Sequence, residues 1–581
     1  GTNGLELWRT DGTTSGTVMV ENIGPGSASG INGGRNLGTM GNALYFVADD
    51  GTNGRELWTL GSGGGSGSTT NVTGATCSIS PALPTGLSMD SSTCTISGTP
   101  SVVTSNTTYT VTANISGTTY QGTVWLSSAY HELTPSVEGA DLTVGDLMDD
   151  ITFQYGTSAA SGSGSSTCIG TACMVKDINA SGNSFNVYPP VMVTVGNTLY
   201  FVAEDGTNGE ELWKSDGTAS GTVMVKDINV SGNGASWHNN VAVIGNTLYF
   251  TADDGTNGNE LWKTDGTASG TVMVKDINSG SSTSLIQLLT PIGNTIYFQA
   301  NDGVHGQELW KSDGTTSGTV MVKDIDNGSS GSWPGDFEVI GNTLYFAASD
   351  SLSTGLELWK SDGTTSGTVL VKDINNGSFS GQVGFLTAMG NTLYFGANDG
   401  VHGTELWKSD GTTSGTVMVK DLFNGSSTGF PQELTVIGNT LYFSARNGTI
   451  DNLGNYIDDG EGYELWKSDG TEAGTVMVKN INPYSVNCAT SNACSSNATY
   501  LTPIGNTLYF SADDGTNGTE LWKSDGTSSG TVMVKDINSN GDGFHLYNRL
   551  MALGNNTYFF ADDGTNGLEL WRTDGTTSGT V

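Results

Sequence analysis

The densest group of oxygen ligands in this sequence lies in one segment, residues 446–464. The stretch RNGTIDNLGNYIDDGEGYE carries carboxylate and carboxamide side chains at Asp451, Asn455, Asp458, Asp459 and Glu461. Such side chains are the ligands that Ca2+ prefers, and they make this loop a candidate metal site. A structural turn competes with that interpretation, because the spacing lacks the alternation of a calcium loop and Asp-Gly pairs form turns. The sequence requires no cofactor and offers Ca2+ as its one candidate ion.

A second group of candidates consists of aromatic side chains in the segments where the repeats of this chain differ most. These segments, among them VSGNGASWHNN and NGSSGSWPGDF, are rich in Asn, Gly and Ser. Aromatic faces supply contact area at little cost in side-chain entropy, so such loops favour recognition of glycans or proteins. The alternative is that the aromatics fill the seams between repeats. The candidate ligand-binding residues are Trp237, His238, Trp333, Phe379, Phe544 and Tyr547.

Catalytic chemistry finds little support in these residues. His305 and His402 replace the Asn of a repeated turn, in DGVHGQELW and DGVHGTELW, and His238 and His545 have no evident Ser or Asp partner. The Asp and Glu residues recur with the repeat, which favours an architectural role over general acid–base work. We therefore predict that the protein is not an enzyme. A propeller hydrolase or lyase acting on polysaccharide is the alternative.

The charge of the chain restricts its partners. The net charge is −37 and the pI is near 4.1, with 21 Lys and Arg among 581 residues. Nucleic acids and anionic membranes are bound through Lys and Arg, which are scarce here. No run of residues approaches the ~18 apolar positions of a membrane span. We predict no nucleic-acid partner and no membrane insertion.

Cysteines and glycosylation sequons indicate an extracellular or cell-surface location. The cysteines form three local couples in Ser/Thr/Asn-rich segments without a neighbouring His, which favours disulfides over zinc. The predicted disulfides join Cys77 to Cys94, Cys168 to Cys173, and Cys488 to Cys494. Candidate glycosylation sites are Asn71, Asn106, Asn114, Asn229, Asn376 and Asn497.

Most of these candidates lie in a repeat. Glu-Leu-Trp recurs ten times, and its Trp residues are 48 or 49 residues apart between Trp213 and Trp407. Each unit contains four short β-prone runs separated by turn residues, as in residues 191–228. Four antiparallel strands in ~40–50 residues indicate a β-propeller blade. We predict an all-β fold, a large β-propeller of eight or nine four-stranded blades, with the Trp and the Tyr-Phe of LYF packed between blades.

The repeat resembles a known family. The stretch ELWKSDGTASGTVMVKDI (residues 211–228) and its sister segments are similar to the repeats of ELWxxDGT-repeat proteins. This resemblance covers about four fifths of the chain. It implies a secreted or cell-surface protein built of repeats, and it implies no particular activity.

An insertion interrupts the second unit. Gly/Ser linkers at residues 61–68 and 161–166 flank a segment containing CSISPALPTGLSMDSSTCTISGTP, which resembles the PIG-type Ig domains of microbial surface proteins. We therefore expect an inserted Ig-like β-sandwich. The expected organisation is propeller at residues 1–62, a linker-flanked insertion at 63–166 with its core at 70–126 and a partial second module at 127–160, and propeller at 167–581.

Strand alternation assigns the loops to faces of the propeller. In an up-down-up-down sheet the second hairpin and the connection to the next blade lie at one end. The first and third turns lie at the other. Since the insertion replaces a third turn, we expect it on the opposite face from the variable blade-to-blade loops.

The two ends of the sequence are redundant, because residues 1–18 and 564–581 are identical. Two closures compete. Residues 173–178 complete the Trp571 blade in an eight-bladed ring, or residues 17–23 complete it and residues 173–178 complete the Trp58 blade in a nine-bladed ring. A tandem array or a head-to-tail assembly would also explain the redundancy. We predict a non-enzymatic structural or adhesion protein, a self-associating filament or surface-layer component that contacts glycans or surface proteins. A glycan-binding propeller lectin is the alternative.

Overall fold

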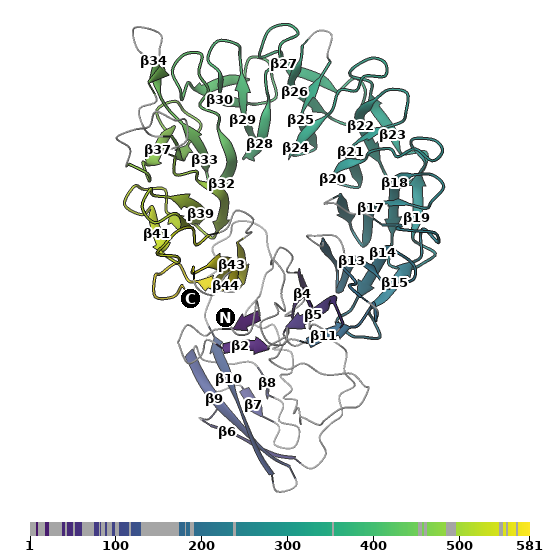
Figure 1. Ribbon diagram of the computed structural model, residues 1–581, viewed down its shortest axis with the longest axis vertical. Helices are drawn as coiled ribbons and strands as arrows, with labels where there is room; N and C mark the ends of the chain where they lie inside the picture. The colour runs from purple at the N-terminus through teal and green to yellow at the C-terminus, as the bar shows by residue number, and fades with distance from the viewer. Residues whose placement is uncertain are drawn as a thin grey trace. The chain divides into compact units, whose positions relative to one another are not determined.

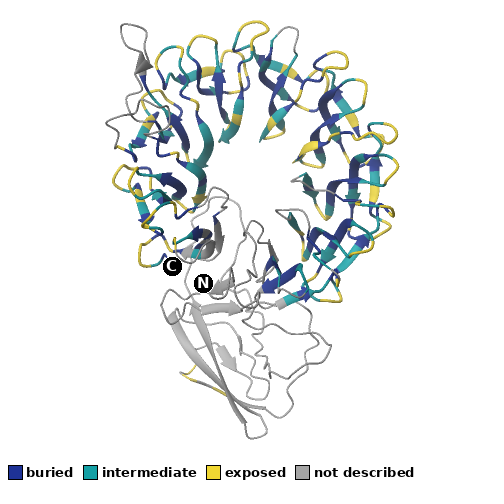
Figure 2. Cartoon of the chain, viewed as in Figure 1, coloured by how far each residue is buried: buried dark blue, intermediate teal, exposed yellow. Residues whose placement is uncertain are grey.

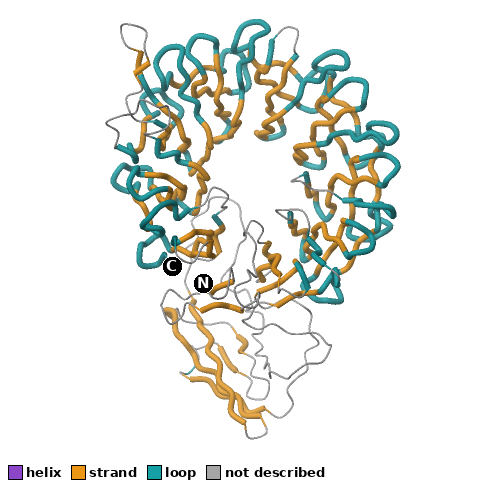
Figure 3. Tube along the Cα trace, viewed as in Figure 1, coloured by secondary structure: helices purple, strands orange, loops and turns teal. Residues whose placement is uncertain are grey.

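The computed structural model describes most of the repeat region and part of the insertion. The described residues are 7–9, 18–21, 38–40, 43–49, 53–60, 75–80, 82, 87–89, 96–98, 104–115, 118–128, 173–180, 182–185, 191–235, 240–350, 354–450, 456–457, 462–483, 495–544, 550–553, 556–564 and 568–580. Over these ranges the regular structure is entirely β, as Figure 3 shows. None of them forms a helix that could span a membrane.

The chain divides into two compact units. Unit 1 comprises Gly1–Gly64 and Cys168–Val581, and unit 2 comprises Gly65–Thr167. In unit 2 an antiparallel sheet has the order β10-β9-β6, and β7 pairs with β8. The strands of unit 2 are β6 (Ala75–Ser80), β7 (Leu87–Met89), β8 (Ile96–Gly98), β9 (Thr104–Ile115) and β10 (Thr118–Ser128).

Unit 1 is a large β-propeller of consecutive antiparallel sheets, or blades, eight of them four-stranded. The first strands are β3 (Gly38–Met40), β12 (Met192–Val195), β16 (Val241–Ile244), β20 (Gln287–Ile292), β24 (Gly335–Ile340), β28 (Gly384–Met389), β32 (Gln432–Ile437), β38 (Thr499–Ile504) and β42 (Met551–Leu553). The second strands are β4 (Ala43–Asp49), β13 (Thr198–Glu204), β17 (Thr247–Asp253), β21 (Thr295–Asn301), β25 (Thr343–Ser349), β29 (Thr392–Asn398), β33 (Thr440–Arg446), β39 (Thr507–Asp513) and β43 (Asn556–Asp562).

The Glu-Leu-Trp motif lies in the third strands. These are β5 (Arg55–Leu60), β14 (Glu210–Ser215), β18 (Asn259–Thr264), β22 (Gln307–Ser312), β26 (Leu356–Ser361), β30 (Thr404–Ser409), β36 (Tyr463–Ser468), β40 (Thr519–Ser524) and β44 (Leu568–Thr573). The fourth strands are β11 (Cys173–Lys176), β15 (Val223–Lys226), β19 (Val272–Lys275), β23 (Val320–Lys323), β27 (Val369–Lys372), β31 (Val417–Lys420), β37 (Val476–Lys479) and β41 (Val532–Lys535). In Figure 1 the labels of first strands lie on the inner side of the series and those of fourth strands on the outer side.

Turn chemistry sets the register of each blade. In the blade of β12–β15, the pairing of Val195 with Thr198 leaves Gly196 and Asn197 as a two-residue turn, and Gly196 has a φ of 58°. A left-handed φ of this kind costs glycine little. The register then places Phe201 opposite Trp213. The same pairing recurs in the other blades, so the repeated sequence produces a repeated register.

The hydrophobic core lies between neighbouring blades, as predicted. One cluster combines Tyr249 and Leu261 of one blade with Phe298 and Trp310 of the next. Figure 2 shows buried residues along the middle of each sheet and exposed residues in its loops. Because one four-stranded sheet cannot cover both of its own faces, each blade depends on its neighbours for burial.

Lysines join the blades at their outer strands. Lys323 Nζ donates to the carbonyl of Thr368 in the next blade (2.9 Å) and lies 5.5 Å from the centroid of the Trp359 ring. Lys311 Nζ donates to the carbonyl of Gly363 (2.8 Å). Equivalent lysines make equivalent contacts along the series, so each seam combines an apolar core with charge-assisted hydrogen bonds.

The ends of the series confirm one half of the predicted nine-bladed closure, in which residues 173–178 complete the Trp58 blade. β11 pairs with β5 and completes the Trp58 blade, so the closure in which residues 173–178 complete the Trp571 blade is wrong. β2 (Val18–Glu21) pairs with β1 (Leu7–Arg9), its own sequence neighbour, and does not complete the Trp571 blade. That blade contains β42, β43 and β44. The local hairpin reproduces the pairing of third and fourth strands seen elsewhere, since Trp8 lies opposite Met19 as Trp213 lies opposite Met224.

Candidate functional site

The buried glutamate of Glu-Leu-Trp holds the start and the end of each blade-to-blade loop. At Glu308, the backbone N–H groups of Ile325 (3.1 Å) and Ser332 (2.9 Å) donate to the carboxylate, and so does the Ser332 hydroxyl (2.6 Å). The side chain is fully buried. Burial raises the pKa of Glu308, and it raises the pKa of Glu405 to about 8. The glutamate therefore acts as a loop anchor, which agrees with its predicted architectural role.

The second hairpins are Asx-type turns. Asp205 Oδ1 accepts from the backbone N–H groups of Thr207 (2.9 Å) and Asn208 (2.8 Å), and its Oδ2 accepts from Asn208 Nδ2 (2.8 Å). Both carboxylate oxygens therefore already accept hydrogen bonds from groups within the turn. The backbone N–H of Glu210 donates to Asn233 Oδ1 (3.0 Å), so the blade-to-blade loop lies against the second hairpin, as strand alternation predicts.

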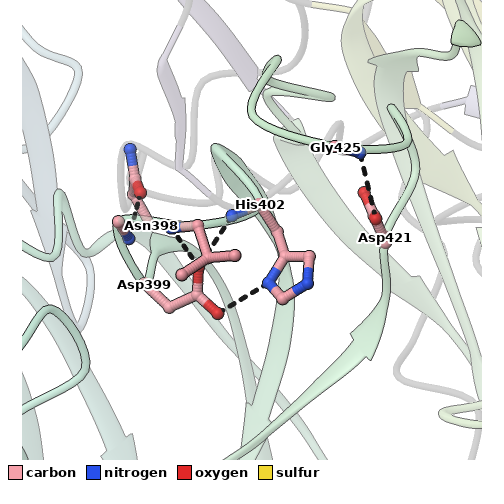
Figure 4. A network of polar contacts seen from close by, with 7 residues as sticks. Asn398, Asp399, His402, Asp421 and Gly425 are labelled. Carbon is pink, nitrogen blue, oxygen red and sulfur yellow. Dashed lines mark hydrogen bonds and ion pairs between the residues drawn. The ribbon is translucent and has the colours of Figure 1, made fainter. Parts of the chain in front are cut away.

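His305 and His402 take the Asn position in this turn. His402 Nδ1 lies 2.8 Å from Asp399 Oδ2, and the His402 ring faces the Asp399 carboxylate in Figure 4. This hydrogen bond raises the pKa of His402. Burial acts to raise the pKa of Asp399, but hydrogen bonds from the backbone and ring of His402 hold it below its usual value. Asp421 accepts from the backbone N–H of Gly425 (3.3 Å), and burial raises its pKa. Both histidines are turn residues, as predicted.

A strained backbone feature recurs where the loops enter five consecutive first strands. Each entry has two non-glycine residues with positive φ, three positions apart, with φ between 44° and 61°. We call these ten residues the entry rim: Leu285 and Leu288, Trp333 and Asp336, Gln382 and Phe385, Phe430 and Glu433, and Asn497 and Tyr500. Glycine adopts this conformation with little strain, and the chain has 85 glycines, yet none of these ten positions is a glycine and five carry Leu, Phe or Trp.

The entry rim contains five exposed large apolar side chains, and Val230, Val304, Phe379 and Val401 are exposed in loops outside it. Trp333 is 63% exposed, Leu285 45% and Phe385 44%. The rings of Phe385 and Phe430, from neighbouring blades, lie edge to face with centroids 6.2 Å apart. Asp336 Oδ2 accepts from the backbone N–H of Phe385 (3.1 Å), so polar rim residues fix the neighbouring blade. Exposed apolar side chains from neighbouring blades that touch, as Phe385 and Phe430 do, are typical of interaction sites.

A small pocket adjoins the entry rim at the blade of β28–β31. Its volume is about 270 Å3. Phe379, 71% exposed, is its one aromatic lining residue. We call it the Phe379 pocket, and its lining residues are Asn375, Phe379, Ser380, Gln382, Asn398, Gly400, Gly403 and Ser426.

The predicted ligand-binding residues have three outcomes. Trp333 and Phe379 are exposed on the predicted loop face. Phe544 is a correction, because it is 1% exposed and packs against Phe559 with ring centroids 5.7 Å apart. Trp237, His238 and Tyr547 lie outside the described residues.

Position within the loop explains the correction and the rim residues that the sequence analysis missed. The eighth residue after the Asp of KDI is buried in every described loop that has this spacing, and it is Phe185, Ala235, Ser284, Ser332, Gly381, Gly429 or Phe544. The ninth residue is exposed at Leu285, Trp333, Gln382 and Phe430. Counting from KDI would therefore have placed Phe544 in the core and Phe430 in the rim.

The other predicted sites remain largely predictions. Asp451, Asn455, Asp458, Asp459 and Glu461 lie outside the described residues, and the described residues contain no cluster suited to a metal ion. Asn376 and Asn497 are exposed, whereas Asn229 is buried and its Nδ2 donates to the carbonyl of Asn233 (3.2 Å). That hydrogen bond uses the nitrogen to which a glycan would be attached.

Only some of the remaining sequons and cysteines lie in described strands. Asn106 and Asn114 lie in β9, and Asn71 lies outside the described residues. Cys77 lies in β6 and Cys173 in β11. Cys94, Cys168, Cys488 and Cys494 lie outside the described residues, so the disulfides stay predictions.

The geometry defines the class of this protein as an all-β propeller with an additional β unit. A model of the family described as "Putative Ig domain" matches residues 60–128, which include the five strands of unit 2. The insertion is therefore Ig-like, as its sequence predicted. No curated protein matches the chain.

Several solved peptidase structures are distantly similar. One of two prolyl endopeptidases is 11% identical with a TM-score of 0.34, over 64% of this chain and 54% of that one. A puromycin hydrolase is 13% identical with a TM-score of 0.33, over 68% and 55%. Oligopeptidase B from Leishmania major is 12% identical with a TM-score of 0.34, over 65% and 54%. The chain spans little more than half the length of each, and likenesses this distant bring no peptidase activity to it.

Proposed function

We propose that this protein is a non-enzymatic extracellular adhesion protein whose blades present the entry rim to a partner. The observation that carries the proposal is that five of ten non-glycine positions with positive φ hold large, exposed apolar side chains, namely Leu285, Leu288, Trp333, Phe385 and Phe430. Strain of this kind costs of order 1 kcal/mol per residue and clusters at functional sites. The polar rim residues Asp336 and Glu433 accept from backbone N–H groups of the neighbouring blade. The exposed apolar rim side chains, such as Trp333, are available to a partner outside the chain.

Three further features support this proposal. The resemblance of the repeats to ELWxxDGT-repeat proteins favours a secreted or cell-surface location, and so does the Ig-like insertion. The described His–Asp pairs, His305 with Asp302 and His402 with Asp399, are parts of turns. Self-association of copies into a filament or surface layer belongs to the same proposal.

Binding of the purified chain to immobilised surfaces tests the proposal. The panel contains neutral polysaccharides, acidic polysaccharides, proteins and the chain itself. We expect saturable binding to at least one surface, lost when Leu285, Trp333 and Phe430 are replaced together by glycine. Val304→Ser with Val401→Ser is the control, because both valines are exposed at hairpin tips outside the entry rim. Equal binding by the rim variant and the control, or turnover of a polysaccharide, would contradict the proposal.

Glycan binding is a second candidate function, favoured by the Phe379 pocket. An exposed aromatic face beside amide and hydroxyl groups matches the chemistry of a sugar ring, which has apolar C–H faces and polar edges.

A further inference from the structure

Phe379 differs in chemical type from the residues at the same position in three sister loops. Counted from the Asp of KDI, the position of Phe379 holds Ser282, Ser330 and Ser427 in the neighbouring loops. A blade therefore folds with a small polar residue at this position. With 71% of Phe379 exposed, its ring contributes little to the core. The aromatic side chain is an addition to the repeat.

The backbone beneath Phe379 is fixed although its ring is open to solvent. A Cβ atom on Gly355 would clash with the carbonyl oxygen of Phe379, so the loop packs directly on the second hairpin of its blade. Asn375 Nδ2 donates to the carbonyl of Ser380 (3.0 Å) and closes the loop. A ring held on a rigid loop is a preorganised stacking surface, which lowers the entropy cost of binding.

Amide groups line the pocket beside the ring. Asn398 Oδ1 accepts from the backbone N–H of Gly400 (2.7 Å), and Gln382 Oε1 accepts from the Thr404 hydroxyl (2.9 Å). These bonds orient both carboxamides and leave the N–H groups of Asn398 Nδ2 and Gln382 Nε2 as donors. Gln382 also replaces the apolar residue that the preceding and following blades carry at this rim position, Trp333 and Phe430.

The lining of the pocket contains no charged residue. In a chain of net charge −37, an anionic ligand would gain no ion pair here and would be repelled. A cationic ligand would find no carboxylate in the lining. The volume of about 270 Å3 falls just below the ~300–1,000 Å3 of pockets for drug-sized ligands, which suits a monosaccharide-sized group.

We infer that the Phe379 pocket binds a neutral saccharide. One face of the sugar ring stacks on Phe379, and ring hydroxyls accept from the amide N–H groups of Gln382 and Asn398. This inference rests on the proposed adhesion function, since it names the ligand class of one site beside the entry rim.

Ligand-observed NMR titration of the full chain tests the inference, with methyl glycosides of glucose, galactose, mannose and N-acetylglucosamine as probes and glucuronate as the anionic comparison. We expect at least one neutral glycoside to bind saturably and more tightly than glucuronate. Phe379→Ser, which restores the residue of the sister loops, should weaken binding by about tenfold, the loss of one aromatic contact. Phe379→Tyr keeps the ring and should stay within about threefold of the original.

The outcomes separate the pocket from the adhesion proposal. Unchanged affinity in Phe379→Ser, tighter binding of glucuronate, or no binding of any neutral glycoside would overturn the saccharide site. In each of those cases, binding to the surface panel that is lost in the glycine variant of the entry rim would still support adhesion. Unchanged surface binding in the glycine variant, together with unchanged glycoside affinity in Phe379→Ser, would overturn both proposals.

Discussion

Two regions of each blade differ in what stays constant from blade to blade. We call the first region, the strands with their recurring side chains, the frame; the second is the entry to the first strand. In the frame, Tyr, Phe, Glu, Trp and Lys recur from blade to blade with the same partners, as at Glu308 and Lys323. At the entry rim the backbone recurs, with two positive φ angles per blade, while the side chains vary from Leu285 to Trp333 to Gln382. A constant backbone that displays varied side chains is a scaffold for recognition. The contacts of the frame stabilise the fold, and the varied side chains of the entry rim give each blade a different surface.

Replacement of a loop anchor should have the largest effect on stability. Glu357 accepts from the backbone N–H groups of Ile374 (2.9 Å) and Asn375 (3.3 Å), below the Phe379 pocket. Glu357→Ala leaves these buried donors unpaired, and each such group costs about 1–3 kcal/mol. We expect the free energy of unfolding to fall by about 3 kcal/mol, with faster amide hydrogen exchange in residues 373–385. Glu357→Gln keeps an acceptor oxygen and should lose less, and a fall below ~0.5 kcal/mol in Glu357→Ala would contradict the anchor role.

Stability should decrease as the pH rises through neutrality. Burial raises the pKa of Glu357 to about 7 and that of Glu405 to about 8, above the ordinary value of 4.5. A raised folded-state pKa contributes stability that is complete below the unfolded value and is lost as the pH passes the folded value. Urea midpoints should therefore be lower at pH 9 than at pH 5, with a smaller difference in Glu357→Gln. A midpoint that rises over this interval would show that the carboxylates are held charged.

Removal of one lysine contact should have an intermediate effect. Lys323→Met keeps the aliphatic stem but removes the hydrogen bond to the Thr368 carbonyl and the cation near the Trp359 ring. We expect a loss of about 1–2 kcal/mol in the free energy of unfolding, from one charge-assisted hydrogen bond and one cation–π contact. Chemical denaturation followed by Trp fluorescence measures it. Lys323→Arg serves as the control that keeps the charge.

Changes in the entry rim should alter stability least. Trp333→Gly removes an exposed side chain and relieves a φ of 51°. The relief offsets the greater freedom of glycine in the unfolded chain, so we expect a change within about 1 kcal/mol of zero. Thermal unfolding checks this expectation. A large loss of stability would mean that Trp333 is part of the frame, and the comparison between the two regions would fail.

The fold could be predicted from the sequence because the same turn and strand patterns recur in every repeat. Gly-Asn turns, alternation in the strands and the spacing of Trp213 and Trp262 all agree, and the structure confirms the four-stranded blades and the cores between them. The ends of the series were harder. Several identical segments compete for the same edge, and the sequence does not show that β2 pairs with its own neighbour β1.

The candidate site could be predicted only in part. Variation among loops identified Trp333 and Phe379, but it failed at Phe544, because variation does not distinguish the exposed ninth position of the loop from the buried eighth position next to it. The positive φ angles of Phe385 and Phe430 have no sequence signal, because residues with left-handed backbones are usually glycine. The buried role of Glu308 depends on N–H groups about 17 to 24 residues away, which only the folded blade brings together.

The most direct test of this account compares surface binding by the original chain and by the combined Leu285→Gly, Trp333→Gly and Phe430→Gly variant, at matched melting temperature. The account predicts that the variant retains its melting temperature within a few degrees, while binding falls by at least about tenfold. Undiminished binding by a stably folded variant would show that recognition, if the chain performs it, lies elsewhere than at the entry rim.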